Sequence, residues 1–195
     1  MRLARTSVAL LGVVLSVVGD GRIWGQAQQP PVSDYLLASG RAGRIELGTS
    51  VDEMYRLFGR DNVRLVDLFK EGMFSPALEV KLPAATVVPA IVADIGQWPC
   101  GEFSVWGIEV RDPRFRTKDG LGVGSTARDL RRAYRFRVTE EEGAHAAVVE
   151  ALKMSFSLTR RGPVDQQRVT GVWIWPDPDA VRTKRCPGRG TPPRS

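Results

Sequence analysis

The 195-residue chain has one histidine and two cysteines, and this shortage leaves little material for metal or cofactor chemistry. His145 alone cannot supply paired imidazole ligands, and neither an H-E-x-x-H nor a C-x-x-C spacing occurs. The chain also lacks a G-x-S-x-G elbow, and Cys100 has none of the local context of a catalytic thiol. The sequence therefore predicts no metal, no cofactor and no catalytic residue.

Long hydrophobic runs are missing as well. The longest, residues 7–19, has 13 residues, whereas a membrane-spanning helix needs about 20. Arg2 and Arg5 precede this run, and residues 25–27 follow it with small side chains at the first and third positions, an order typical of a secretory signal peptide. We expect cleavage near Ala27 and a soluble mature protein in the periplasm or outside the cell. No cysteine in or just after the run offers a lipid acceptor.

A strong excess of one charge is absent from the expected folded body. The whole chain carries a formal charge of +6, but residues 28–181 hold 20 basic and 21 acidic side chains, a net charge of −1. The excess positive charge lies in the predicted signal peptide and in the C-terminal tail. Overall basicity is therefore no reason to expect a specific nucleic-acid partner.

The two cysteines, Cys100 and Cys186, belong to a chain expected in an oxidising compartment, where a single disulfide is the natural inference. Closing so long a loop is worth about 4 kcal/mol if the bond is unstrained. The alternative is a pair of free thiols.

The most informative feature is an internal similarity. Residues 48–58, GTSVDEMYRLF, align without a gap with residues 124–134, GSTARDLRRAY, at an offset of 76. Each copy has glycine, two hydroxyl residues, an acid, Met or Leu, arginine and an aromatic in the same order. At the same offset, three alternating apolar residues of one copy match three of the other, namely Leu78, Val80 and Leu82 with Met154, Phe156 and Leu158.

Each copy has the start signal of a helix. Ser50 lies three residues before Glu53, and Thr126 lies three before Asp129, which is the spacing of a capping box with Asp as a shorter substitute in the second copy. Apolar residues then recur at i, i+3 and i+7 in both copies and predict one core-facing side. These positions are Val51, Met54 and Phe58, then Ala127, Leu130 and Tyr134.

Alternating segments after each helix predict antiparallel strands, at residues 78–82, 87–95, 104–111, 154–159 and 169–175. Segments 61–74 and 138–153 fit either a helix or a strand. We predict an α+β fold of two tandem helix-plus-antiparallel-sheet repeats packed as one compact unit. The expected divisions are a signal peptide (1–27), a flexible segment (28–39), repeat 1 (40–98), repeat 2 (99–176) and a Pro/Arg-rich tail (177–195).

The glycines of "TKDGLGVGSTARDLRRAY", residues 117–134, suggest a phosphate-binding loop at first sight. A Walker-type loop needs lysine before its last hydroxyl residue, where Gly124 stands, and the spacing of the glycines does not fit the dinucleotide fingerprint. Gly124 also has a counterpart in Gly48, whereas Gly120 and Gly122 correspond to Arg44 and Glu46. We therefore interpret Gly124 as a tight entry into a capped helix.

Tryptophans are the candidate binding residues on the predicted sheet. Alternation puts Trp173 and Trp175 on one face of a strand, opposite its branched aliphatic residues. Trp106 is expected to share a face with Ile108 and Val110. On an open face these indoles would be anchors for protein recognition, and the alternative is ordinary core packing.

A second candidate surface is basic. Residues 111–137 carry nine basic and three acidic side chains, whereas the matching residues 44–70 carry five of each. Such a cluster suits an anionic partner, and the alternative is a solvated helix face. The candidate binding residues of this cluster are Arg128, Arg131, Arg132 and Arg135.

The repeated unit, I-x-x-G-[ST]-[ST]-x-x-[DE]-[LM]-x-R-x-[FY] followed by alternating strands, resembles small bacterial envelope proteins over residues 40–176. The similar types are the β-lactamase inhibitory protein, with two tandem repeats, and the small lipoprotein of the outer-membrane barrel assembly machinery, with one. The resemblance implies a non-enzymatic protein that presents sheet surface to another protein. This chain departs from both in lacking a lipid-acceptor cysteine and a disulfide inside each repeat.

We therefore expect a secreted or periplasmic binding protein that engages another envelope or secreted protein through a sheet face. The alternatives are a binder of an anionic envelope ligand through residues 111–137, or an unrecognised hydrolase whose active site assembles from distant residues.

Overall fold

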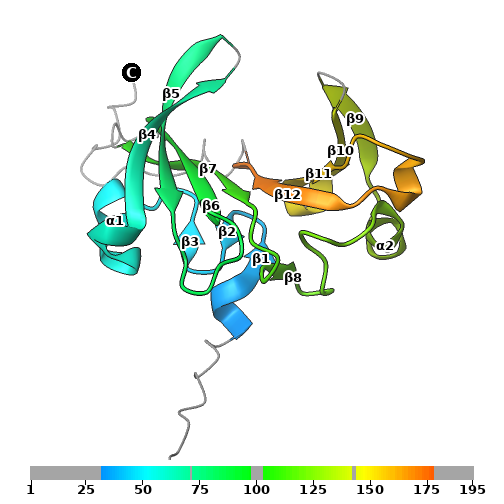
Figure 1. Cartoon of the computed structure of the whole chain (residues 1–195), viewed down its shortest axis with the longest axis horizontal. Helices are drawn as coiled ribbons and strands as arrows, with labels where there is room; N and C mark the ends of the chain where they lie inside the picture. Colours follow the sequence, from blue (N-terminus) through cyan, green and yellow to red (C-terminus); the bar gives the residue numbers. More distant parts are fainter. Residues whose placement is uncertain (1–31, 71, 98–102, 142–143, 178–195) are drawn as a thin grey trace, which may run out of the picture.

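The computed structural model describes residues 32–70, 72–97, 103–141 and 144–177. Its main element is one antiparallel 8-stranded sheet in the order β4-β5-β6-β7-β12-β11-β10-β9. A 4-stranded sheet in the order β3-β2-β1-β8 and two α-helices accompany it (Figure 1). The predicted α+β class is confirmed.

The large sheet consists of β4 (Val63–Lys70), β5 (Met73–Val80), β6 (Ile91–Gln97), β7 (Phe103–Val110), β9 (Arg137–Glu141), β10 (Ala144–Val149), β11 (Met154–Leu158) and β12 (Val169–Ile174). The small sheet consists of β1 (Leu36–Ala38), β2 (Arg41–Ala42), β3 (Ile45–Glu46) and β8 (Arg116–Thr117). The helices are α1 (Val51–Phe58) and α2 (Ala127–Ala133), with short 3-10 turns η1 (Val32–Tyr35), η2 (Arg60–Asn62), η3 (Glu150–Leu152) and η4 (Val164–Gln166).

Both helices begin where the sequence predicts. The Ser50 hydroxyl accepts from the backbone N–H of Glu53, and the Thr126 hydroxyl accepts from that of Asp129. The box closes only at Thr126, because the Asp129 carboxylate accepts from the Thr126 backbone while the Glu53 carboxylate pairs with Arg56 instead. Asp129, the shorter acid, thus completes a capping box, whereas Glu53 does not.

The helices and the small sheet cover one side of the large sheet, and this side holds the core. Met54 of α1, Leu130 of α2 and Ile45 of β3 are fully buried against strand residues such as Ile108 and Phe156. Figure 1 shows the helices and the small sheet below the large sheet, while the β4–β5 and β9–β10 hairpins rise at its two ends. Among the residues that the structure describes, helices therefore cover only one face of the sheet.

The two tandem repeats predicted within one compact unit are not clearly seen in the structure. Each helix is followed by four strands, but β7 and β12 pair with each other and join all eight strands into one sheet. Beyond the helices, the sequence offset of 76 does not match equivalent strands. The apolar residues that it aligns lie in or just after β5, the second strand after α1, and in β11, the third strand after α2.

The two segments that the sequence left ambiguous are mainly strands, β4 and the β9–β10 hairpin. The small sheet was not predicted, because strands of two or three residues are too short to show a period. Cys100, Cys186, the predicted signal peptide and residues 178–195 of the tail lie outside the described residues. Among the helices that the structure describes, none has the length and apolarity needed to span a membrane.

Candidate functional site

The face of the large sheet turned away from the helices is called here the open face. A row of directly opposed residues crosses six strands of this face, in the order Arg64, Glu79, Val92, Glu109, Trp173 and Ser155. The adjacent row points the other way and includes the buried residues Leu78, Ile108 and Ile174. This row of the open face is thus mostly polar, with Trp173 among its members.

Trp173 lies flat on this face because its neighbour on β7 has no side chain. A Cβ atom added to Gly107 would come within 2.4 Å of the Trp173 ring. Above the ring, the Lys70 ammonium lies 4.8 Å from its centroid, a cation–π contact. The same ammonium donates to both carboxylate oxygens of Asp94, at 2.9 and 2.8 Å. A half-buried indole is therefore held between strand backbone and a fixed cation.

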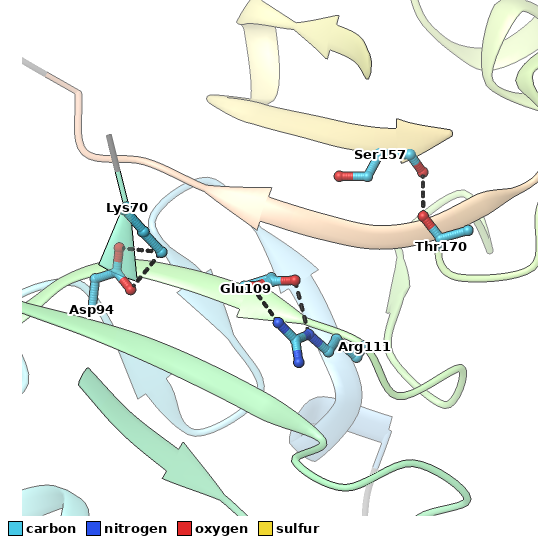
Figure 2. A network of polar contacts seen from close by, with 6 residues as sticks. All are labelled: Lys70, Asp94, Glu109, Arg111, Ser157 and Thr170. Carbon is cyan, nitrogen blue, oxygen red and sulfur yellow. Dashed lines mark hydrogen bonds and ion pairs between the residues drawn. The ribbon is translucent and has the colours of Figure 1, made fainter. Parts of the chain in front are cut away.

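A second ion pair lies beside the tryptophan. Arg111 donates to Glu109 through Nε at 2.8 Å and Nη2 at 3.0 Å, a two-point contact (Figure 2). This hydrogen bond raises the pKa of the Arg111 guanidinium above its ordinary value, against the lowering effect of its partial burial, and the carboxylate of Glu79 adds to the rise. The ion pair holds the Arg111 and Glu109 side chains in place, so the open face presents hydrogen-bond donors and acceptors in fixed directions.

Small residues leave room around these groups. Gly171 precedes Trp173 on the same face, and Ser155 and Ser157 occupy the neighbouring positions of β11. Figure 2 shows the Lys70–Asp94, Glu109–Arg111 and Thr170–Ser157 contacts spread over neighbouring strands. In the last of these, the Thr170 hydroxyl donates to the Ser157 carbonyl at 3.3 Å. A partner surface can therefore approach the sheet closely.

Trp106 does not share a face of the sheet with Ile108 and Val110, so the expectation from the sequence alternation is wrong here. The β6–β7 register shifts between Asp94 and Ile95, so the alternation along β7 breaks at Trp106. Ile108 and Val110 are fully buried, whereas 39% of Trp106 is exposed. Its Cβ lies 3.2 Å from the position that a Cβ on Gly96 would take, which places it on the open face.

Trp175 follows the end of β12, and its backbone N–H donates to the Lys153 carbonyl at 3.2 Å. Its side chain is partly buried. Of the three predicted tryptophans, the structure thus brings Trp106 and Trp173 onto the sheet's open face and leaves Trp175 just beyond a strand end.

The four predicted basic residues are exposed, three on α2 and Arg135 just after it, and two of the four form ion pairs with acidic residues. Arg131 pairs with Asp165 at 3.1 Å and stacks on Phe136, and Arg132 lies 3.7 Å from Asp129. Arg128 and Arg135 form no ion pair with any residue that the structure describes. Elsewhere in 111–137, the arginines at 111, 114 and 137 are also paired with carboxylates.

The glycine loop before α2 uses its backbone donors internally. Gly122 N–H donates to the Ser125 hydroxyl, Gly124 N–H to the Val169 carbonyl, and Ser125 N–H to the Gly122 carbonyl. Gly124 has φ of 91°, the positive value that favours glycine. These groups support the helix entry and are not available to a phosphate.

His145 contacts Gln167, with Nδ1 3.0 Å from Oε1, and its Nε2 lies 3.8 Å from the Glu140 carboxylate. Gln167 is buried and donates to the Gly162 carbonyl, so it fixes the imidazole ring. No hydroxyl or thiol nucleophile is among the contacts of His145 in the described part of the chain. Within that part, no three His, Cys, Asp or Glu side chains are grouped to hold a metal.

The sequence reasoning missed the charged members of the open face. Lys70 and Asp94 lie on β4 and β6, and only the curved sheet brings them to Trp173. Glu109 and Arg111 are two residues apart at the end of β7, which is the spacing of neighbours on one face of a strand. This spacing would have predicted their ion pair.

No protein-family model matches the chain, and no curated protein matches it either. Among solved structures, the chain is similar to the crystal structure of the uncharacterized protein yfeY from Escherichia coli, with a TM-score of 0.53 and 18% sequence identity. The similarity covers 73% of this chain and 99% of that chain. At this identity the comparison shows a shared fold alone.

Proposed function

We propose that the protein is an exported, non-enzymatic binding protein whose open sheet face engages another protein. The observation that carries this proposal is the position of Trp173, half-buried over Gly107 and beneath Lys70, with the small residues Gly171, Ser155 and Ser157 beside it. Tryptophans held in this way are typical anchors of protein interfaces, because little conformational entropy is lost when they are covered.

The raised β4–β5 hairpin supports a protein partner on the open face. The tip of β4–β5 exposes Phe69, Met73 and Phe74, each with at least 67% of its surface accessible, and the two phenylalanine rings contact each other. Met73 is paired with Lys70, which contacts Trp173, so Met73 lies on the side of the hairpin that continues the open face. A partner on the open face would meet this exposed apolar side chain at the end of the sheet.

We also propose that the two helix-plus-four-strand halves are a duplicated unit that divides after β7. Equivalent backbone bonds support this: Gly48 N–H donates to the Val105 carbonyl at 2.7 Å, and Gly124 N–H to the Val169 carbonyl at 2.8 Å. Val105 and Val169 each return a bond to the residue after that glycine, at 2.9 and 2.8 Å. The resemblance to β-lactamase inhibitory protein and to the barrel-assembly lipoprotein stays a hypothesis.

Export and the disulfide are further parts of the proposal. Residues 1–27 would be removed as a signal peptide, and Cys100 would pair with Cys186 in the periplasm or outside the cell. The N-terminal sequence of the mature protein tests the first part. Its intact mass after alkylation without reductant tests the second, since two added alkyl groups would show free thiols.

Alanine substitution tests the role of the open face. Trp173→Ala should retain the fold but weaken capture of the envelope partner roughly tenfold or more. Tyr55→Ala, which removes an aromatic side chain from α1 on the covered side, is the matched control and should capture the partner normally. Equal loss from both variants, or loss of the folded state in Trp173→Ala, would contradict an anchor role.

An anionic envelope ligand is the second candidate, supported by exposed Arg128 and Arg135, which form no ion pair with a residue of the described ranges. Binding at these positions should weaken steeply with salt and with Arg128→Gln/Arg135→Gln. Binding that withstands both changes would exclude this surface.

A further inference from the structure

A pocket of about 490 Å³ lies on the covered side of the molecule, away from the open face. The end of α1, the small sheet and the segment after β5 form its walls. Its volume falls within the roughly 300–1,000 Å³ of small-ligand sites. Nothing in the interaction with a protein partner requires this space.

The interior of the pocket is apolar. Ala42, Ile91 and Phe115 form buried parts of its lining, and Phe58 and Tyr35 are partly buried beside them. The Tyr35 and Phe115 rings meet edge to face, with centroids 5.1 Å apart, so this wall is rigid. Such a lining suits an aromatic or aliphatic body.

One lining cation is already neutralised. Arg114 donates to both oxygens of the buried Asp112 and also to the Tyr35 hydroxyl, at 2.9 Å, and the Pro83 carbonyl, at 2.7 Å. The hydrogen bond that Arg114 donates to Asp112 raises the pKa of Arg114, whose partial burial acts in the opposite direction. Arg114 therefore fixes the wall of the pocket and has little charge left to offer.

Two other lining cations have no such partner. Arg44 lies 5.9 Å from the centroid of the Phe58 ring, and Lys81 follows the end of β5. Neither forms an ion pair with a residue of the described ranges, and both are exposed at the rim. The lining has one carboxylate, Asp34, so its unneutralised charge is positive.

From this combination we propose that the pocket binds a small amphipathic anion, with its apolar body against Phe58 and Phe115 and its carboxylate or phosphate at Arg44 and Lys81. Charge-assisted hydrogen bonds to two rim cations favour the anionic head, and the apolar lining favours the body. This site is separate from the open face and does not depend on its function.

Titration with octanoate, octyl phosphate, 1-octanol and inorganic phosphate, followed by amide chemical shifts of the full mature chain, tests the site. Octanoate and octyl phosphate should shift pocket residues such as Ala42 and Leu57, and their relative affinities decide between a carboxylate and a phosphate head. Octanol and inorganic phosphate should bind at least about tenfold more weakly, because each lacks half of the required chemistry. Equal binding of all four probes, or shifts confined to the open face, would overturn the proposal.

A charge-matched pair of variants separates the pocket from general basicity. Arg44→Gln/Lys81→Gln should weaken binding of the anionic probes roughly tenfold and leave octanol binding unchanged. Arg160→Gln/Arg161→Gln removes the same charge from the exposed segment after β11 and should have no effect. All four positions are exposed, so both variants should keep the thermal midpoint of the parent protein. Equal losses in the two variants, or no loss in either, would contradict a role for the pocket cations.

Discussion

At the residue scale, the open face depends on the absence of one side chain. Gly107 lets the Trp173 ring lie against the β7 backbone, where a Cβ atom would overlap it at 2.4 Å. Gly171, on the neighbouring strand, has its nearest atoms at 3.7 Å from the same hypothetical Cβ, an ordinary contact. Both glycines lie on the open face, but only Gly107 is needed for the position of the Trp173 ring.

Gly107→Ala should lower the free energy of unfolding by about 1–3 kcal/mol, because the ring must move or the strand must shift. Gly171→Ala is the matched control and should change it by less than about 0.5 kcal/mol. Urea denaturation of both variants measures the difference. Equal effects would show that Trp173 does not lie on Gly107.

Asp129 gives the fold a pH dependence at low pH. The hydrogen bond from the Thr126 side chain, with that from its backbone, lowers the pKa of Asp129 below 3.8. A carboxyl with a lowered pKa in the folded state adds stability above its unfolded pKa, and this is lost as pH falls through the folded pKa. The parent should therefore melt above Asp129→Asn at neutral pH, and the gap should close in strong acid.

Asp52→Asn is the control for this comparison, since Asp52 lies in the first turn of α1 and makes no capping bond in the described structure. Thermal unfolding from neutral to strongly acidic pH should show a closing gap for Asp129→Asn alone. A gap that stays constant with pH would rule out the capping carboxylate as its source.

At the element scale, the sequence predicted what local patterns encode. Both helices and the strands β5, β6, β7, β11 and β12 followed from caps and alternation. The segments of β4, β9 and β10 fitted a helix as well as a strand, and β1–β3 are too short to show a period. Alternation failed at Trp106 because one bulge residue reverses the facing of everything before it. The pairing of Lys70 with Asp94 beside Trp173 depends on the curvature of the sheet, which no local pattern records.

The two helix caps should differ in strength. Thr126→Ala and Ser50→Ala should each cost about 0.5–2 kcal/mol of unfolding free energy. The loss should be larger at Thr126, because Asp129 loses its reciprocal hydroxyl contact there, whereas Glu53 is paired with Arg56. Chemical denaturation measures both, and a larger loss at Ser50 would contradict the structural difference between the caps.

The β4–β5 hairpin tip should serve binding more than folding. Phe69→Ser/Phe74→Ser should cost about 1 kcal/mol of stability, the value of an exposed aromatic pair, but should weaken partner capture clearly. Val88→Ser removes an apolar side chain of similar exposure, 66%, from the segment before β6 and should leave capture unchanged. Parallel pull-down and denaturation measurements separate these effects, and unchanged capture by the double variant would exclude the hairpin tip from the interface.

At the scale of the whole molecule, helices and the small sheet cover one face of the eight-stranded sheet, and the proposal assigns the other face to a protein partner. Site-specific photo-crosslinking in the native host tests this arrangement most directly, with the reactive residue placed at Ser157 on the open face or at Asp52 on α1. We predict a discrete protein adduct from position 157 that disappears in Trp173→Ala, and none from position 52. An adduct from position 52 alone, or one from position 157 that withstands Trp173→Ala, would contradict binding through the open face.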